Sequence, residues 1–329
     1  MKQILICGIG NALVDSEYKV SEEEITNLNL TKGCMELNDR ENHIKLSSRL
    51  RETHGTVKMM PGGSVANSLY TLSRFGADVS FIGRVSDDTT GDTFIDSLEN
   101  TGVRVNINRV DNGITGECLV LITPDHERTM YTHLGVSSEL SVEDINQAVI
   151  KDSEYLLVEG YLVTSEETHN VASYSLDIAT KYGIKKIITL SDPNVVKFFR
   201  DNILELLNKK FDIIFCNKQE ALNISMSNNI DDAIDFLREY AYEIIITSGE
   251  DGAYVTIGNE KAHEVPDKVK PVDLTGAGDM FLAAYVFAKI SNKILTDRIK
   301  FANTCSGSVI QKYGAKLDNQ DYGKLLERL

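Results

Sequence analysis

Apolar and polar residues alternate along this chain in two patterns. In the second half of the chain, short apolar runs alternate with helix-length amphipathic stretches. Short apolar runs that end in polar residues predict strands at 154–160, 186–192, 212–217 and 243–248. Helix-length amphipathic stretches accompany them, near 165–182, 195–209, 218–224 and 230–240. The sequence therefore predicts an α/β fold with a doubly wound, mainly parallel sheet, helices on both faces, and ligands at the carboxyl ends of the strands.

Two segments instead contain short strand-like runs and no long amphipathic helix, namely 16–38 and 103–134. We expect them to pair into a small β-sheet that covers the main domain as a lid. The large α/β domain would then comprise 1–15, 39–102 and 135–329. Period-two alternation puts Arg128, Met130 and Thr132 on one face of the lid, which suits its inner face or, equally, a solvated hairpin.

Composition narrows the class of protein. The formal net charge of −15 argues against a nucleic-acid or anionic-membrane partner, so a bound anion would need local amides, a metal ion or a few Lys and Arg side chains. The five cysteines are scattered and are expected to be small buried residues in a reducing compartment. With neither a signal-peptide pattern nor an 18-residue apolar run, we expect a cytoplasmic protein.

The stretch Asp273–Tyr285, DLTGAGDMFLAAY, holds the most distinctive candidate chemistry. Gly276 and Gly278 allow a ligand to approach the backbone, and the helix expected at Met280–Ile290 directs unpaired N–H groups at that ligand. Asp279 falls in the first turn, where a carboxylate could take a proton from a hydroxyl. A plainer interpretation is a helix capped by Thr275, with a tight turn and an acid that complements the helix dipole.

Other polar groups fall where helices begin or strands end. Gly62 and Gly63 precede a helix that carries Asn67, and Asp15 follows an expected strand at 4–10. Further candidates end successive strands: Asp192, Asn217, Glu220, Thr247, Gly249 and Gly252. Each alone is more often a cap or turn residue. The glycines at 8 and 10 could begin a dinucleotide fingerprint, but Leu13 stands where its third glycine belongs, which argues against a Rossmann oxidoreductase.

Taken together, these motifs resemble the ribokinase-like (PfkB) family of carbohydrate and nucleoside kinases. The likeness covers the whole chain in order and includes GGSVAN at 62–67, GRVSDDTTG at 83–91, DLTGAGD at 273–279 and KYGA at 312–315. It implies transfer of the γ-phosphoryl group of ATP to a primary alcohol, with Asp279 as the base and the amides of Gly276, Ala277 and Gly278 as the anion hole. It also implies Mg²⁺ organised by Asn217 and Glu220, mostly through water, and an ATP site lined by Asn217, Glu220, Thr247, Gly249, Gly252 and Asn303.

The acceptor is expected from a likeness to the adenosine kinase branch of that family. GNALVD would place Asp15 on ribose hydroxyls and Leu13 against a base, and GGSVANS would bring Gly62, Gly63, Ser64 and Asn67 to the acceptor. The same likeness implies an Arg128 that faces a phosphate and a Met130 beside the base, with Tyr161 or Leu162 as further apolar cover. One residue departs from the family pattern: in the turn within GRVSDDTTG, Ser86 stands where a glycine is common.

We therefore expect a purine nucleoside as acceptor, with the 5'-hydroxyl of adenosine as the first choice. The alternative is a sugar such as ribose, fructose or a 2-keto-3-deoxy sugar acid. A non-catalytic nucleoside or ATP sensor is a remote third, because it would be expected to lose the base or the anion hole. The resemblance also raises a monovalent cation such as K⁺, without ligands that can be placed. The protein could be a monomer or a homodimer.

Overall fold

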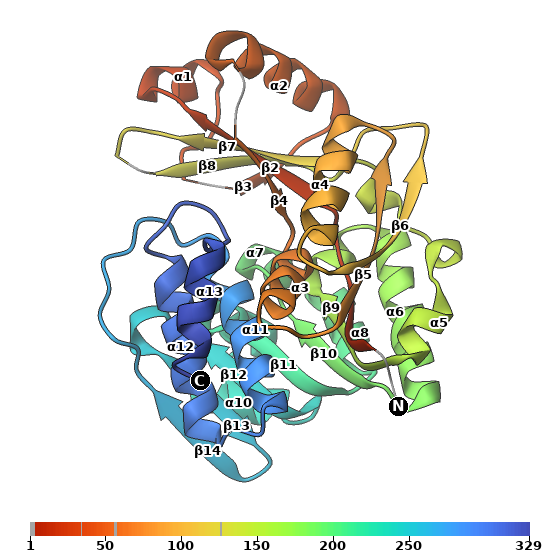
Figure 1. Ribbon diagram of the computed structural model, residues 1–329, viewed down its shortest axis with the longest axis vertical. Helices are drawn as coiled ribbons and strands as arrows, with labels where there is room; N and C mark the ends of the chain where they lie inside the picture. Colours follow the sequence, from red (N-terminus) through yellow and green to blue (C-terminus); the bar gives the residue numbers. More distant parts are fainter. Residues whose placement is uncertain (1–3, 34, 56–57, 126) are drawn as a thin grey trace.

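The computed structural model describes residues 4–33, 35–55, 58–125 and 127–329, which form two sheets (Figure 1). The larger has nine strands in the order β14-β13-β12-β11-β10-β9-β1-β5-β6. All are parallel from β12 to β6, and β13 and β14 join antiparallel. In chain order they are β1 (Ile4–Ile9), β5 (Val79–Ser86), β6 (Arg104–Val110), β9 (Ser153–Glu159), β10 (Lys185–Thr189), β11 (Phe211–Asn217), β12 (Ala241–Thr247), β13 (Ala253–Ile257) and β14 (Glu260–Glu264).

Helices cover both faces of this sheet because its central strands are apolar on both sides. In β11, Ile213 and Phe215 join one core, and Ile214 and Cys216 join the other. The first core is closed by α3 (Ser64–Arg74), α4 (Thr89–Glu99), α11 (Ala277–Ile290), α12 (Leu295–Val309) and α13 (Asn319–Leu326). The second is closed by α5 (Gln147–Lys151), α6 (Glu166–Tyr182), α7 (Pro193–Phe198), α8 (Arg200–Leu207), α9 (Lys218–Ser225) and α10 (Ile230–Leu237). The predicted doubly wound sheet is confirmed.

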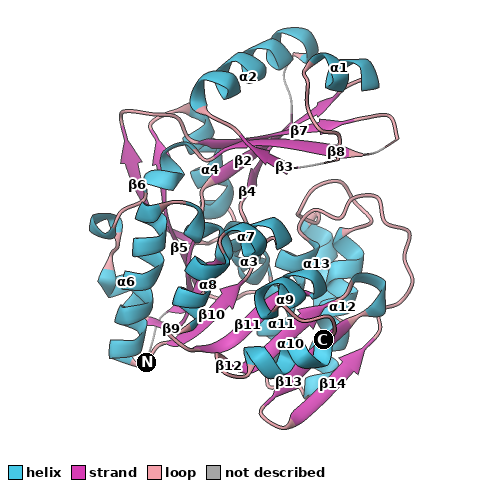
Figure 2. Cartoon of the chain, turned by 180° about the vertical axis from the view of Figure 1, so that it is seen from behind, coloured by secondary structure: helices cyan, strands magenta, loops and turns pink. Residues whose placement is uncertain are grey.

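The smaller sheet has five strands in the order β3-β8-β7-β2-β4. They are β2 (Leu13–Lys19), β3 (Met35–Leu37), β4 (Lys58–Gly62), β7 (Gly116–Ile122) and β8 (Arg128–His133). Helices α1 (Glu22–Asn27) and α2 (Arg40–His54) pack on the face that points away from the large sheet (Figures 1 and 2). Leu46 and Leu50 of α2 form a small core there with Tyr18, Leu119 and Leu121. The opposite face of the small sheet points toward the large sheet.

The boundaries predicted for the two units differ from the observed pairing. The sequence pattern assigns 103–134 to the lid, yet β6 is hydrogen-bonded to β5 at the edge of the large sheet. Conversely, the pattern assigns β4 and α2 to the large domain, yet β4 pairs with β2 and α2 covers the small sheet. The physical reason is that alternation along a strand such as RVNINRV indicates a half-exposed edge strand without indicating which sheet it joins.

Two smaller expectations have clear outcomes. Cys7, Cys118, Cys216 and Cys305 are free and buried, as predicted, whereas Cys34 lies outside the described residues. In the part of the chain that the structure describes, no helix has the length and apolar character needed to cross a membrane.

Candidate active site

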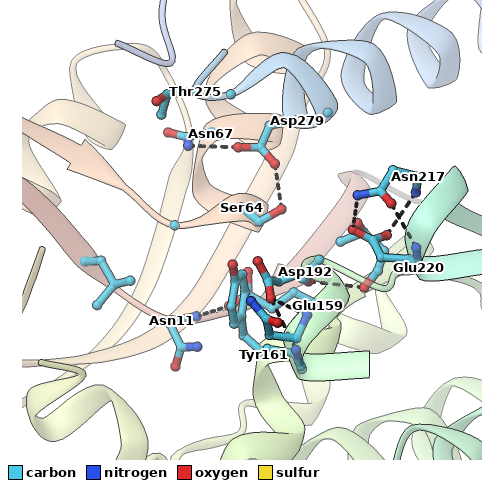
Figure 3. Close-up of a pocket in the computed structure, with 18 of the residues that line it drawn as sticks. Asn11, Ser64, Asn67, Glu159, Tyr161, Asp192, Asn217, Glu220, Thr275 and Asp279 are labelled. Carbon is cyan, nitrogen blue, oxygen red and sulfur yellow. Dashed lines mark hydrogen bonds between the residues drawn. The ribbon is translucent and has the colours of Figure 1, made fainter. Parts of the chain in front are cut away.

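A cavity of about 1030 Å³ lies between the carboxyl ends of the large sheet's strands and the inner face of the small sheet. Several polar side chains from distant segments meet in it (Figure 3). The small sheet contributes apolar groups, including Leu13, Leu37, Cys118 and Met130. The cavity therefore has a polar floor and a partly apolar roof.

Asp279 lies in the first turn of α11, and both of its carboxylate oxygens have donors from α3. Ser64 Oγ donates to Oδ1 at 2.6 Å, and Asn67 Nδ2 donates to Oδ2 at 2.9 Å (Figure 3). Burial raises the pKa of Asp279 to about 6, against the opposing effect of these two donors and of the Lys316 ammonium. The result is a carboxylate that is ionised at neutral pH and more basic than an exposed aspartate.

Asn67 also has a free acceptor beside this acid. Because its amide nitrogen donates to Asp279, its Oδ1 points elsewhere, and this buried oxygen has no hydrogen-bond partner among the described residues. An unpaired buried acceptor costs free energy unless a ligand supplies the donor. The pair of Asn67 and Asp279 therefore suits a bound hydroxyl.

The start of α11 has the geometry of an anion site. Gly276 is the N-cap residue with φ of 75°, and a side chain there would collide with Ala315. Gly278, one residue into the helix, has open space where a Cβ would stand. The Ala277 amide donates to Leu274 O at 3.3 Å, whereas the amides of Gly278 and Asp279 have no intrahelical acceptor by helix geometry. Backbone donors thus lie next to the base.

Asp15 and the glycine pair meet directly before α3. The Asp15 carboxylate lies against Gly62, where an added Cβ would come within 2.7 Å of its Oδ1. Gly63 has φ of 90° and leads directly into α3. Burial raises the pKa of Asp15 to about 6, against the Lys316 and Arg128 cations. Asp15, Gly63, Ser64 and Asn67 line the cavity, whereas Gly62 contributes by its close approach to Asp15.

Glu159, at the end of β9, is a cavity residue that the sequence analysis missed. It is fully buried and accepts hydrogen bonds from the amides of Asn11 at 2.8 Å and Val65 at 3.0 Å (Figure 3). Burial raises its pKa to about 7, although these two amides oppose the shift. Its place at the end of an apolar strand is the same signal that identified Asp192 as a candidate and could have found it.

Asn217 and Glu220 are joined by a capping box at the start of α9. Asn217 donates from its backbone N and its Nδ2 to the Glu220 carboxylate, and Glu220 N donates to Asn217 Oδ1. Burial raises the pKa of Glu220 to about 7, and the nearby Asp192 carboxylate adds to the shift. All three residues line the cavity.

The chemistry of this set fits a hydrated Mg²⁺. The described residues contain no cluster of three His, Cys, Asp or Glu able to hold a metal ion, so a closed protein cage is not available. The buried carboxylate of Glu220, already bonded to Asn217, and the half-buried carboxylate of Asp192 face one cavity and match an ion that keeps several of its waters.

Of the other residues expected at the ATP site, one lines the cavity and three do not. Thr247, at the end of β12, lines the cavity. Gly249 and Gly252 form the tight turn that connects β12 to β13, with Gly252 N donating to Gly249 O. Asn303, on α12, donates from Nδ2 to Glu264 O at 2.9 Å. The described residues that line the cavity do not include Gly249, Gly252 or Asn303.

Arg128 is engaged by protein groups rather than open to the cavity. Its guanidinium donates to Thr275 Oγ1 at 2.8 Å and to Glu17 Oε1 at 2.7 Å, and it lies 3.0 Å from Asp273 Oδ2. The described residues that line the cavity include Met130 and Thr132 of the same strand but not Arg128. In this structure the guanidinium is bound by protein groups, and the phosphate contact that the sequence resemblance implies for Arg128 stays a prediction.

Comparison with known proteins identifies the family to which this chain belongs. Residues 33–321 match the model of the pfkB family carbohydrate kinases, and the chain belongs to this family. It is therefore a phosphotransferase that acts on a hydroxyl group.

Known relatives carry both sugar and nucleoside names. A ribokinase from Staphylococcus aureus (strain COL) is 27% identical over 268 residues, which cover 79% of this chain and 84% of the relative. A probable sugar kinase from Rhizobium etli CFN 42 superposes over all of both chains with a TM-score of 0.90 and 28% identity. An adenosine kinase from Sinorhizobium meliloti has a TM-score of 0.89 and 28% identity, with 98% of this chain and 99% of that chain covered.

Proposed function

We propose that the protein transfers the γ-phosphoryl group of ATP to a primary hydroxyl of a purine nucleoside, with the 5'-hydroxyl of adenosine as the first choice. The observation that carries the proposal is Asp279, a buried acid held by Ser64 and Asn67 at the start of α11, inside the cavity. Phosphoryl transfer needs an aligned hydroxyl and stabilised charge, and this position offers both.

Each side chain then has a defined task. Asn67 Oδ1 accepts a hydrogen bond from a second, neighbouring hydroxyl and so orients the acceptor. The reacting hydroxyl donates its one hydrogen to Asp279, which takes that proton as the oxygen attacks. The amides at the start of α11 stabilise the negative charge that develops on the transferred group. When bound, Mg²⁺ would neutralise phosphate charge, and Asn217, Glu220 and Asp192 are the residues that would hold it through water.

The apolar roof supports a nucleoside. Leu13, Cys118 and Met130 line the cavity above the polar floor, so a flat apolar ring has a surface to cover it there. Asp15 lies on the same strand as Leu13, two residues further on, where it can accept hydrogen bonds from two neighbouring hydroxyls. The solved adenosine kinase with 28% identity is consistent with this assignment.

A sugar is the second candidate acceptor. Asn11, Asp15, Asn67 and Glu159 give the cavity more polar groups than a ribose moiety alone would use, and the curated relative at 27% identity is a ribokinase. Under this alternative the same base and anion site act on a smaller molecule. The apolar roof would then cover the sugar without contributing to its selection.

A coupled assay of ADP release across adenosine, inosine, guanosine, ribose and fructose tests the proposal. We expect release with purine nucleosides and little with free sugars. Release with ribose or fructose but not with nucleosides would establish the sugar alternative. ATP binding without ADP release for any acceptor would favour a sensor. Replacing K⁺ by tetramethylammonium in the same assay tests the dependence on a monovalent cation.

A further inference from the structure

A buried carboxylate directly before the anion site gathers four contacts. Asp273 Oδ1 accepts from Thr275 N at 3.0 Å and from Thr275 Oγ1 at 2.8 Å. Its Oδ2 accepts from Gly314 N at 2.6 Å and lies 3.0 Å from Arg128. The Asp273 side chain is only 1% exposed, so these contacts are shielded from water.

Arg128 reaches this carboxylate from the other sheet. It begins β8 of the small sheet, and Glu17 on β2 of the same sheet holds one of its amino groups. The other amino group donates to Thr275 Oγ1. The guanidinium therefore bridges the small sheet and the loop that leads into α11.

The loop fixed in this way carries the anion site. Thr275 immediately precedes Gly276, the N-cap of α11. On its far side, Gly276 packs against Ala315, which follows the Gly314 amide bound by Asp273. The Asp273 carboxylate thus binds both Thr275, which precedes Gly276, and Gly314, which precedes the Ala315 that packs against Gly276. Arg128 of the small sheet pairs with this same carboxylate.

We propose that Arg128 is a positioning residue that couples the small sheet to the anion site through Asp273 and Thr275. The inference rests on the proposed kinase function, since it assigns the start of α11 to the transferred phosphoryl group. With the pair formed, the small sheet roofs the cavity and the amides of α11 are held in place for transfer. Without it, the loop 273–276 gains freedom just where misplacement by about an ångström can cost on the order of 10²-fold in rate.

A double-mutant cycle separates this role from direct phosphate binding. We expect Arg128→Gln and Asp273→Asn each to lower kcat by about 10- to 100-fold, and the double variant to be within about threefold of the worse single variant. An arginine that instead binds the nucleotide predicts a raised KM for ATP in Arg128→Gln and effects that multiply in the double variant. Either of those results would overturn the proposal.

Arg128→Lys sharpens the distinction. Lysine keeps the charge but lacks the planar fork that reaches Thr275 Oγ1 and Asp273 together. We expect it to recover little of the lost kcat, whereas a phosphate contact would be largely restored by a lysine. Arg109→Gln is the matched control, because Arg109 lies on β6 and pairs with Asp92 and Asp87. It should leave kcat and KM unchanged.

Amide hydrogen exchange of the ligand-free protein gives a readout that does not depend on activity. Exchange at 274–279 should become at least about tenfold faster in Arg128→Gln and stay unchanged in Arg109→Gln. Unchanged exchange at 274–279 in Arg128→Gln would contradict the positioning role of Arg128. If the exchange result holds but the wild-type protein phosphorylates none of the acceptors, the proposed function fails and the structural coupling does not.

Discussion

Both carboxylate oxygens of the proposed base, Asp279, accept hydrogen bonds from neutral groups. Ser64 and Asn67 hold Asp279 in position without the strong stabilisation that a salt bridge would give its charge. Burial is therefore the largest influence on the pKa of Asp279 and raises it to about 6. An aspartate with such a pKa is a better proton acceptor than an exposed one and remains ionised at neutral pH.

Asp279→Asn should remove the proton acceptor with little change in fold. Asn67 can turn its amide so that its free Oδ1 faces the new amide group, which keeps the hydrogen bond between the two side chains. We expect kcat to fall by ~10²–10⁴-fold, as is usual when a general base is lost. Steady-state kinetics measure this. Asp177→Asn, at an exposed ion pair with Lys209, serves as the control. Near-full activity of Asp279→Asn would mean that another group is the base.

The same pKa shift makes opposite predictions for activity and stability. Activity should fall as pH drops through about 6, because Asp279 must be ionised to act. For stability, a carboxyl whose pKa is raised from 3.8 to about 6 binds its proton more tightly in the folded state. Its contribution is fully present below 3.8 and is lost as pH rises through about 6.

Asp279→Asn should therefore stabilise the protein at alkaline pH. The penalty for an ionised buried carboxylate is ~3 kcal/mol for a shift of this size, and the substitution removes it near pH 8 but not near pH 4. Urea unfolding of both proteins at the two pH values measures the difference. An equal difference at both pH values would show that the ionisation of Asp279 is not its source.

At the scale of an element, the start of α11 contains two glycines with different tasks. Gly276 needs its positive φ and its contact with Ala315, so Gly276→Ala should be strained and should clash. Gly278 has ordinary helical backbone and open space where a Cβ would stand, so nothing among the described residues opposes Gly278→Ala. The open space next to Gly278 is where we place the transferred phosphoryl group.

The two alanine variants should separate folding from catalysis. Gly276→Ala should lower both the free energy of unfolding and kcat. Gly278→Ala should keep the stability, or raise it by up to ~1 kcal/mol through helix propensity, while its methyl group still lowers kcat. Thermal unfolding and kinetics on the same preparations check this. Full activity of Gly278→Ala would show that the space beside it is not used for transfer.

The elements most readily predicted from sequence are those whose partners are close in the chain. Gly276, Gly278 and Asp279 are neighbours, so their arrangement follows from helix geometry alone. By contrast, Glu159 acquires its role from Asn11, 148 positions away, and Arg128 meets Thr275 across 147 positions. Local pattern cannot supply such pairings, so the strand-end signal can single out Glu159 without its partners, and the partners of Arg128 stay open.

At the scale of the whole molecule, the candidate active site is the cavity between the large sheet and the small sheet. Parallel strands bring Glu159, Asn217 and Thr247 to one edge, and this convergence was predictable from the strand order. The opposite wall comes from the small sheet, whose membership was only partly predictable. The strand β6 alternates as a lid strand would and yet pairs with β5, whereas β4, with the sequence KMMPG, lacks this alternation and pairs with β2. Under the proposed function, the apolar groups that would select a nucleoside lie on the small sheet, whose strands the sequence predicts least well.

Ligand-dependent stability should reveal which acceptor both walls fit. A ligand at about 100 times its Kd stabilises the native state by ~2.7 kcal/mol, which amounts to several degrees in Tm for a domain of this class. We expect adenosine to raise Tm at submillimolar concentration, because it contacts the polar floor and the apolar roof together. Ribose, which reaches only the floor, should need much higher concentrations for the same shift. Differential scanning fluorimetry over a concentration series measures both.

A substitution in the roof makes this comparison specific. Leu13→Asn places a polar group on the cavity wall and should weaken the response to adenosine by about tenfold in concentration while leaving the response to ribose in place. Ile44→Asn, at an exposed position on the outer helix α2, is the matched control and should change neither response. If ribose stabilises the protein as well as adenosine does, and Leu13→Asn alters neither response, the roof takes no part in recognition. The acceptor would then be a sugar bound by Asp15, Asn67 and Glu159 alone.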